Sequence, residues 1–233
     1  MPTTQVHIVL VPRENSKSAN PPAPVSGGNP NLVNSADYTN SFPREVIKEF
    51  EAGVKADELG RTEKAIGHYH KAIRLAPNFY PARNNLGTRY LSKGDFRNAE
   101  EQFREALKLN KNDPQAYFNL GNVFYSTKRY DDARQILLDG LAKSPNSAFG
   151  NYLLGCVLLR MGDPGSAERL LITAKQLDPR MSRILIELAN LYLQTGKRDA
   201  GIRQLEEFLR RFPKDPLVPK VKESLKKLEG PAR

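Results

Sequence analysis

The side chains that most often carry catalysis or bind metal ions are few and widely spaced in this sequence. His68 and His70 lie two residues apart in a stretch that we expect to be helical, so they point to different sides and do not form a metal-binding pair. Cys156 has no histidine in its expected surroundings to act as a base, and we interpret it as a structural thiol. The sequence contains no phosphate-binding loop, Cys-x-x-Cys pair or Gly-x-Ser-x-Gly motif. We therefore predict no enzymatic activity, no cofactor and no metal site.

Asparagine is the polar residue that recurs with a regular spacing. Asn85 and Asn119 lie 34 residues apart, and each is followed by Leu-Gly. A carboxamide both donates and accepts hydrogen bonds, so a series of asparagines can bind the main chain of an extended peptide whatever its sequence. The same spacing is also expected if the chain repeats one structural unit.

Rows of 34 residues, counted from residue 46, align without a gap. One column holds small residues, namely Gly53, Gly87, Gly121, Gly155 and Ala189. A second small column consists of Ala65, Ala99, Ala133, Ala167 and Gly201. Glycine stands between them at Gly60, Gly94, Gly162 and Gly196, with Lys128 as the exception. Proline ends the rows at Pro77, Pro145, Pro179 and Pro213, with Lys111 as the exception. Because glycine closes helices and proline cannot continue them, each row predicts two helices joined by a short turn, with small residues where the helices approach.

These columns resemble the tetratricopeptide repeat family, whose unit is also 34 residues long. The resemblance covers residues 46–215 and implies an all-α, right-handed solenoid of five helix pairs within residues 44–215. The repeats would be at about 46–79, 80–113, 114–147, 148–181 and 182–215. No row carries tryptophan at the family's usual aromatic position, which is occupied by Glu49, Arg83, Tyr117, Asn151 and Leu185.

An amphipathic segment follows the fifth row. Residues 216–229 place Leu217, Val221, Leu225 and Leu228 along one face, which predicts a helix that caps the solenoid, followed by a short tail at 230–233. We prefer this interpretation to a membrane-surface helix, because the segment is short and has acidic residues among its lysines.

The resemblance implies that the first helix of each pair lines a concave groove. The residues of rows two to five that would face it are Asn84, Asn85, Thr88, Gln115, Phe118, Asn119, Asn122, Phe149, Tyr152, Leu153, Cys156, Arg160, Arg183, Ile186, Glu187 and Asn190. We expect Asn85, Asn119 and Asn122 to bond the backbone of an extended peptide. We expect the apolar residues of row four to contact its side chains. The alternative is an unused groove whose asparagines are merely solvated.

Two specialised kinds of family member use residues of this groove in different ways. One sub-class binds the C-terminal carboxylate of heat-shock chaperones with two lysines, an arginine and two asparagines spread over three rows. No choice of three successive rows in this sequence supplies those cations. The recurring Asn85 and Asn119 are more similar to the asparagine ladder of O-linked N-acetylglucosamine transferases, over two successive rows. The sequence thus predicts a non-catalytic scaffold or adaptor that binds another protein.

The net charge of +10 suggests a rival function, the binding of RNA by a helical-repeat protein. The basic residues are scattered through turns and outer faces with acidic residues close by, and the groove lacks the cationic track with stacking aromatics that single strands require. An acidic protein partner explains the charge equally well, and we favour a monomer.

The first 43 residues differ in composition from the rest. They are rich in Asn, Ser, Pro and Gly, which predicts a flexible N-terminal arm at 1–43, with residues 5–11 either a lone strand or a chance apolar run. The strand would pair with another chain or belong to a β domain that precedes this sequence. No signal peptide or membrane span is recognised, so we expect a cytoplasmic location, with an envelope or secreted location as the alternative if the N-terminus is truncated.

Overall fold

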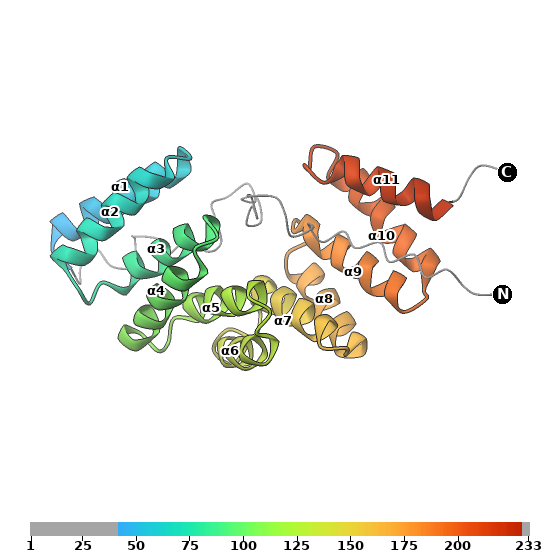
Figure 1. Cartoon of the computed structure of the whole chain (residues 1–233), viewed down its shortest axis with the longest axis horizontal. Helices are drawn as coiled ribbons and strands as arrows, with labels where there is room; N and C mark the ends of the chain where they lie inside the picture. Colours follow the sequence, from blue (N-terminus) through green and yellow to red (C-terminus); the bar gives the residue numbers. More distant parts are fainter. Residues whose placement is uncertain (1–41, 230–233) are drawn as a thin grey trace. The chain divides into compact units, whose positions relative to one another are not determined.

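The computed structural model of the protein describes residues 42–229, and every regular element within this range is an α-helix (Figure 1). The described chain therefore has the all-α class that the sequence predicts. The expected strand at 5–11, nearly all of the N-terminal arm, and the tail at 230–233 lie outside the described residues. Residues 42–145 and residues 146–229 belong to two compact units, and each is described by itself.

The first unit contains three successive helix pairs. Its helices are α1 (Arg44–Glu58), α2 (Thr62–Leu75), α3 (Tyr80–Ser92), α4 (Phe96–Leu109), α5 (Pro114–Ser126) and α6 (Tyr130–Lys143). Each pair packs tightly within itself, and α2 also packs against α3, and α4 against α5. The first helices of neighbouring pairs, α3 and α5, are in contact as well.

The second unit contains two helix pairs and a final single helix. Its helices are α7 (Ala148–Arg160), α8 (Pro164–Leu177), α9 (Ser182–Gln194), α10 (Arg198–Arg211) and α11 (Val218–Glu229). Val221, Leu225 and Leu228 of α11 are buried in one apolar cluster with Leu205 and Phe208 of α10. The last helix thus begins two residues after the start of the predicted segment, and it covers the apolar side of the fifth pair.

The turns within the pairs have the geometry that the glycine column predicts. Gly60, Gly94, Gly162 and Gly196 all have positive φ angles, between 68° and 85°. Lys128, the exception in that column, adopts the same left-handed conformation with φ 61°, and it is the non-glycine residue with positive φ in the described chain. The fold therefore imposes this conformation on the turn even where the side chain disfavours it.

The first small column lies where the two helices of a pair approach most closely. A Cβ atom on Gly87 would lie 2.7 Å from Cε1 of Phe103, and one on Gly53 would lie 2.6 Å from Cε1 of Tyr69. Both distances are shorter than any normal contact, so only glycine fits. The close approach brings the backbone of the first helix against a large buried side chain of the second, as the packing interpretation requires.

Candidate functional site

The predicted groove residues of the first unit all lie on α3 and α5. Asn84, Asn85, Thr88, Phe118 and Asn119 are buried, whereas Gln115 and Asn122 are half-buried. The helix pair arrangement therefore gathers the predicted polar residues on two contacting helices. Most of these side chains are buried and therefore not exposed on the surface of the groove.

A hydrogen-bonded network connects α3 and α5 through these side chains. Nδ2 of Asn119 donates to Oδ1 of Asn84 over 3.1 Å and lies 3.5 Å from Oγ1 of Thr88. The Gln115 side chain donates to Oδ1 of Asn119 over 3.4 Å. Asn119 thus uses its donor and its acceptor inside the protein. Asn122, one turn further along α5, has no hydrogen-bond partner among the described residues, so its carboxamide remains available.

Asn85 belongs to a second buried network, which joins three helices. Its side chain forms a hydrogen bond with the hydroxyl of Tyr69 on α2, and that hydroxyl donates to Oδ2 of Asp57 on α1 over 2.6 Å. The Nε atom of Arg89 on α3 lies 3.5 Å from Oδ1 of Asp57. Burial raises the pKa of the Asp57 carboxyl above its ordinary value, although the charge of Arg89 and the Tyr69 hydrogen bond act in the opposite direction.

Neither Asp57, Tyr69 nor Arg89 was a candidate from the sequence. The sequence does set Tyr69 apart, because it is the only residue with a polar group in a column of the 34-residue rows. The other members of that column are Phe103, Leu137, Leu171 and Leu205. A buried tyrosine hydroxyl needs a hydrogen-bond partner, but the spacing alone does not identify that partner as Asp57.

The predicted residues of the second unit lie on α7 and α9, which contact each other. Phe149 and Leu153 are buried with 7% and 3% of their surface exposed, and Tyr152 is half-buried. Of the three residues that the sequence predicts to contact peptide side chains, Tyr152 is therefore the most exposed.

A polar cluster occupies the same two helices. Arg183, Glu187 and Asn190 follow one another on one face of α9, and the Asn190 side chain bonds to the Glu187 carboxylate. The charges of Arg160 on α7 and Arg183 favour the ionised carboxylate, but burial is the larger effect and raises the pKa of Glu187. Burial also raises the pKa of the Cys156 thiol well above its ordinary value, which agrees with a structural rather than a nucleophilic thiol.

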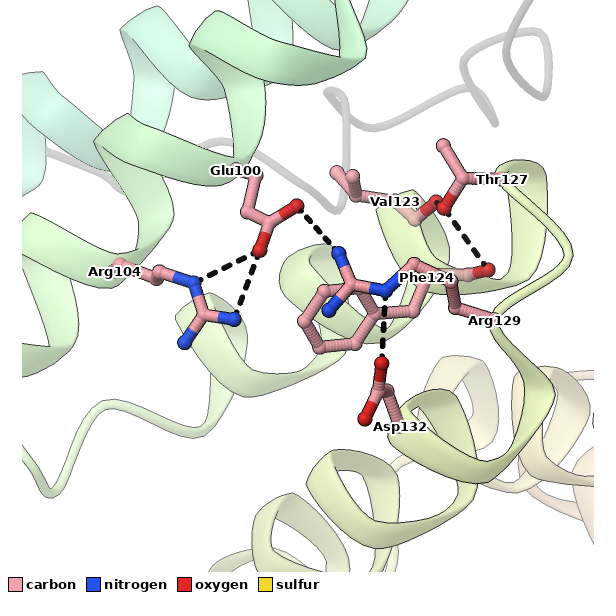
Figure 2. Close-up of polar contacts among 7 residues, drawn as sticks. All are labelled: Glu100, Arg104, Val123, Phe124, Thr127, Arg129 and Asp132. Carbon is pink, nitrogen blue, oxygen red and sulfur yellow. Dashed lines mark hydrogen bonds and ion pairs between the residues drawn. The ribbon is translucent and has the colours of Figure 1, made fainter.

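The outer surface of the first unit carries ion pairs that join successive helix pairs. Figure 2 shows Glu100 of α4 between the guanidinium groups of Arg104 and Arg129, at 2.8 Å and 2.9 Å. Arg129 also lies over the ring of Phe124, 4.2 Å from its centroid, and pairs with Asp132 over 2.8 Å. Glu100, Arg104 and Arg129 line an open groove of about 560 Å³ along α4.

The second unit repeats the same contact with other residues. Lys197 pairs with Glu168 over 3.1 Å and lies 5.5 Å from the ring centroid of Tyr192. In the 34-residue rows these three residues occupy the positions of Arg129, Glu100 and Phe124. The basic residues at these turns are therefore engaged in contacts between neighbouring repeats.

Two family models, both described as tetratricopeptide repeat, match residues 84–148 and 158–225. Together they cover more than half of the chain. The chain belongs to the tetratricopeptide repeat (TPR) family. The aromatic position without tryptophan and the turn without glycine are thus variations within TPR units.

The TPR assignment agrees with similarities to proteins of known identity. The type IV pilus assembly protein PilF of Pseudomonas aeruginosa is 29% identical over 138 residues, which are 58% of this chain and 54% of PilF. Among solved structures, TTC0263 of Thermus thermophilus gives a TM-score of 0.67 at 22% identity, covering 79% of this chain and 98% of that one. The TPR protein YrrB gives a TM-score of 0.57 at 17% identity, covering 82% and 98%. This chain therefore spans about half the length of PilF, and the two structural similarities concern the fold.

Two further observations describe what the TPR helices contain. None of the helices within residues 42–229 is long and apolar enough to cross a membrane. Within the same range, no group of three or more His, Cys, Asp or Glu side chains is arranged to hold a metal ion.

Proposed function

We propose that this TPR protein is a non-catalytic scaffold or adaptor, and that the first helices of its repeats hold an extended segment of another protein. The TPR family supports an interaction role in general. The observation that carries the specific proposal is Asn122 on α5, a half-buried carboxamide with no hydrogen-bond partner among the described residues. This carboxamide is not one of the buried groups that lack a partner, so it meets solvent, and the backbone of a bound peptide offers it both a donor and an acceptor.

The proposal assigns different roles to asparagines that look equivalent in the sequence. Asn119 holds α5 to α3 through Asn84, so it orders the surface on which Asn122 lies. Asn122 then bonds the peptide backbone. YrrB, which has a similar fold, is described as having an unusual peptide-binding site, and that description applies to YrrB itself.

The ion pairs favour a protein over a nucleic acid as the partner. Arg129, Lys197, Lys93 and Lys175 all pair with carboxylates within 3.1 Å. Phosphate binding would have to replace these pairs, whereas nucleic-acid binding usually relies on unpaired Lys and Arg side chains that neutralise phosphates and thereby release the counterions condensed on the nucleic acid. The net charge of +10 nevertheless favours a peptide that carries acidic residues.

The test is to select binding peptides from a random displayed library and to titrate them against variants. Asn122→Ala removes the available carboxamide and no hydrogen bond within the described protein, so it should fold normally. We expect it to weaken the selected peptides by about tenfold, the effect of losing one or two hydrogen bonds. Gln135→Ala, on the exposed side of α6, is the matched control and should leave their affinity unchanged.

Two results would contradict the proposal. The first is a set of selected peptides that binds wild type and Asn122→Ala equally. The second is the absence of any binding peptide together with binding of mixed-sequence RNA that falls steeply between low and physiological salt. That second result would favour nucleic acid instead.

A further inference from the structure

The exposed side of α11 is strongly basic. The opposite side of this helix is apolar and is buried against α10 in one core cluster. Most of the exposed positions of α11 are lysines, and a further exposed lysine lies in the turn that precedes the helix. Four of these residues, which we call the lysine face, are Lys214, Lys220, Lys222 and Lys226.

The two carboxylates within residues 214–227 already have partners. Asp215 accepts a hydrogen bond of 2.7 Å from the hydroxyl of Ser182. Glu223 pairs with Lys227 over 2.6 Å. The ammonium groups of the lysine face form no ion pair or hydrogen bond with the part of the chain that the structure describes. The lysine face therefore carries positive charges that no described carboxylate neutralises.

Lysines between successive repeats are neutralised by the neighbouring repeat. Lys93 pairs with Glu63 of the preceding repeat over 2.6 Å, and Lys175 pairs with Glu207 of the following repeat over 2.7 Å. α11 packs against α10, and its exposed side is covered by no other helix within the described residues. A carboxylate that pairs with the lysine face must therefore come from another molecule.

We propose that the lysine face binds an acidic stretch of a partner protein, a segment with several Asp or Glu residues in succession. The inference goes beyond the proposed function, because this surface lies on α11 and uses no residue of α3 or α5. Each lysine ammonium group is a point charge on a flexible stem, so it pairs with a carboxylate without requiring one backbone geometry. The contact therefore recognises charge rather than one exact sequence, and it weakens when salt is added.

Other anionic partners fit the lysine face less well. A helix that binds a membrane surface buries its apolar side in the lipid, but the apolar side of α11 is buried in the protein core. Single-stranded nucleic acid requires aromatic side chains on which bases stack, and none of the exposed residues between positions 214 and 228 is aromatic. The lysine face offers charge alone, which is sufficient for a run of carboxylates.

The experiment measures the binding of two fluorescent peptides to the full chain by fluorescence anisotropy. One peptide alternates Glu with Asp, and the other has the same length and alternates Gln with Asn. We expect wild type to bind the acidic peptide and not the amide peptide, and we expect added salt to weaken this binding. A fourfold variant should weaken it by about tenfold, because exposed ion pairs contribute little individually but act together. This variant combines Lys214→Gln, Lys220→Gln, Lys222→Gln and Lys226→Gln.

Two further variants separate the position of the charges from their number. The matched control removes the same charge from exposed lysines of the first unit and combines Lys48→Gln, Lys55→Gln, Lys64→Gln and Lys111→Gln. It should keep the affinity within about twofold, because salt screens charges that the peptide does not touch. Arginine at all four positions of the lysine face keeps the charge and should keep the affinity. Circular dichroism confirms that each variant is folded, and Lys222→Gln with Lys226→Gln tests the proposal if the fourfold variant does not fold.

Three results would overturn the inference. The first is an equal loss of affinity in the two fourfold Gln variants, which would reflect net charge alone. The second is no binding of the acidic peptide to folded wild type, including the case in which phosphatidylserine vesicles or mixed-sequence RNA bind the lysine face instead. The third is binding of the acidic peptide that Asn122→Ala abolishes and the fourfold lysine variant preserves. None of these results contradicts the role proposed for Asn122, which is tested with the selected peptides.

Discussion

Asn119 on α5 donates a hydrogen bond of 3.1 Å to Asn84 on α3, and both side chains are completely buried. The partner of Asn119 is thus the residue next to Asn85, its counterpart in the preceding repeat. The recurrence of asparagine at this position has a structural reason at Asn119, because the bond connects the first helices of successive repeats. The binding role proposed for the groove then depends on Asn122, which makes no such bond.

Removing the Asn119 carboxamide should therefore destabilise the protein as well as affect binding. Asn119→Ala removes the hydrogen bond that joins the two buried side chains across α3 and α5, and we expect a loss of about 1–3 kcal/mol in the free energy of unfolding, measured by urea denaturation. Asn122→Ala should change that free energy much less. Equal losses in the two variants would show that the 3.1 Å bond has no special role.

Gly87 should tolerate no larger side chain. In Gly87→Ala the new Cβ would lie 2.7 Å from the Phe103 ring, so the helices of the second pair must move apart, and we expect destabilisation of about 1–3 kcal/mol. Gly67→Ala is the matched control, because Gly67 is also helical but nothing lies within 4 Å of its added Cβ. It should stabilise the protein by about 0.5–1 kcal/mol through helix propensity. The melting temperatures of the two variants should therefore shift in opposite directions from that of wild type. Shifts in the same direction would contradict this account.

Lys128 should be replaceable by glycine with a gain in stability. Its φ of 61° is costly for a side chain with a Cβ atom, and glycine adopts this conformation without strain. We expect Lys128→Gly to raise the free energy of unfolding by about 0.5–1 kcal/mol, despite the greater entropy of glycine in the unfolded chain. Lys111→Gly, in a turn where φ is not positive, should instead lower it slightly. A destabilised Lys128→Gly would mean that the lysine side chain makes a contribution larger than the backbone strain.

The raised pKa of Glu187 predicts how stability depends on pH. Because burial raises its pKa in the folded state, the folded protein holds this proton more tightly than the unfolded chain does. The resulting stability is present below the unfolded pKa of about 4.3 and is lost as pH rises through the folded value. The free energy of unfolding of wild type, minus that of Glu187→Gln, should therefore be larger at about pH 4 than at about pH 7.

Glu49 provides the control of opposite sign for this measurement. Hydrogen bonds from Lys71 and His68 lower the pKa of its carboxyl, so its contribution is present above the unfolded pKa and is lost as pH falls through the folded value. The corresponding difference for Glu49→Gln should be smaller at about pH 4 than at about pH 7. A Glu187 difference that follows the Glu49 trend would contradict the burial argument.

Much of the fold could be predicted from the sequence because its determinants are local. Glycine and proline act on the residues next to them, and the 34-residue spacing of small residues such as Gly87 and Gly121 repeats the same helix contact. Even Lys128 occupies the turn that its glycine column predicts. The polar contacts between side chains were harder to predict from the sequence. Tyr69, Asp57 and Arg89 come from three different helices, and no regular spacing in the sequence links them.

The sequence by itself determined the number and order of the helix pairs and the positions of their turns. Only the tertiary structure decided which side chains pair with which. Asn119 bonds Asn84 rather than Asn85, and one oxygen of Glu187 has no hydrogen-bond partner among residues 42–229. The physical reason is that hydrogen bonds depend on distances of a few tenths of an ångström between different helices. Those distances follow from how successive repeats pack, which the spacing of residues along the chain does not specify.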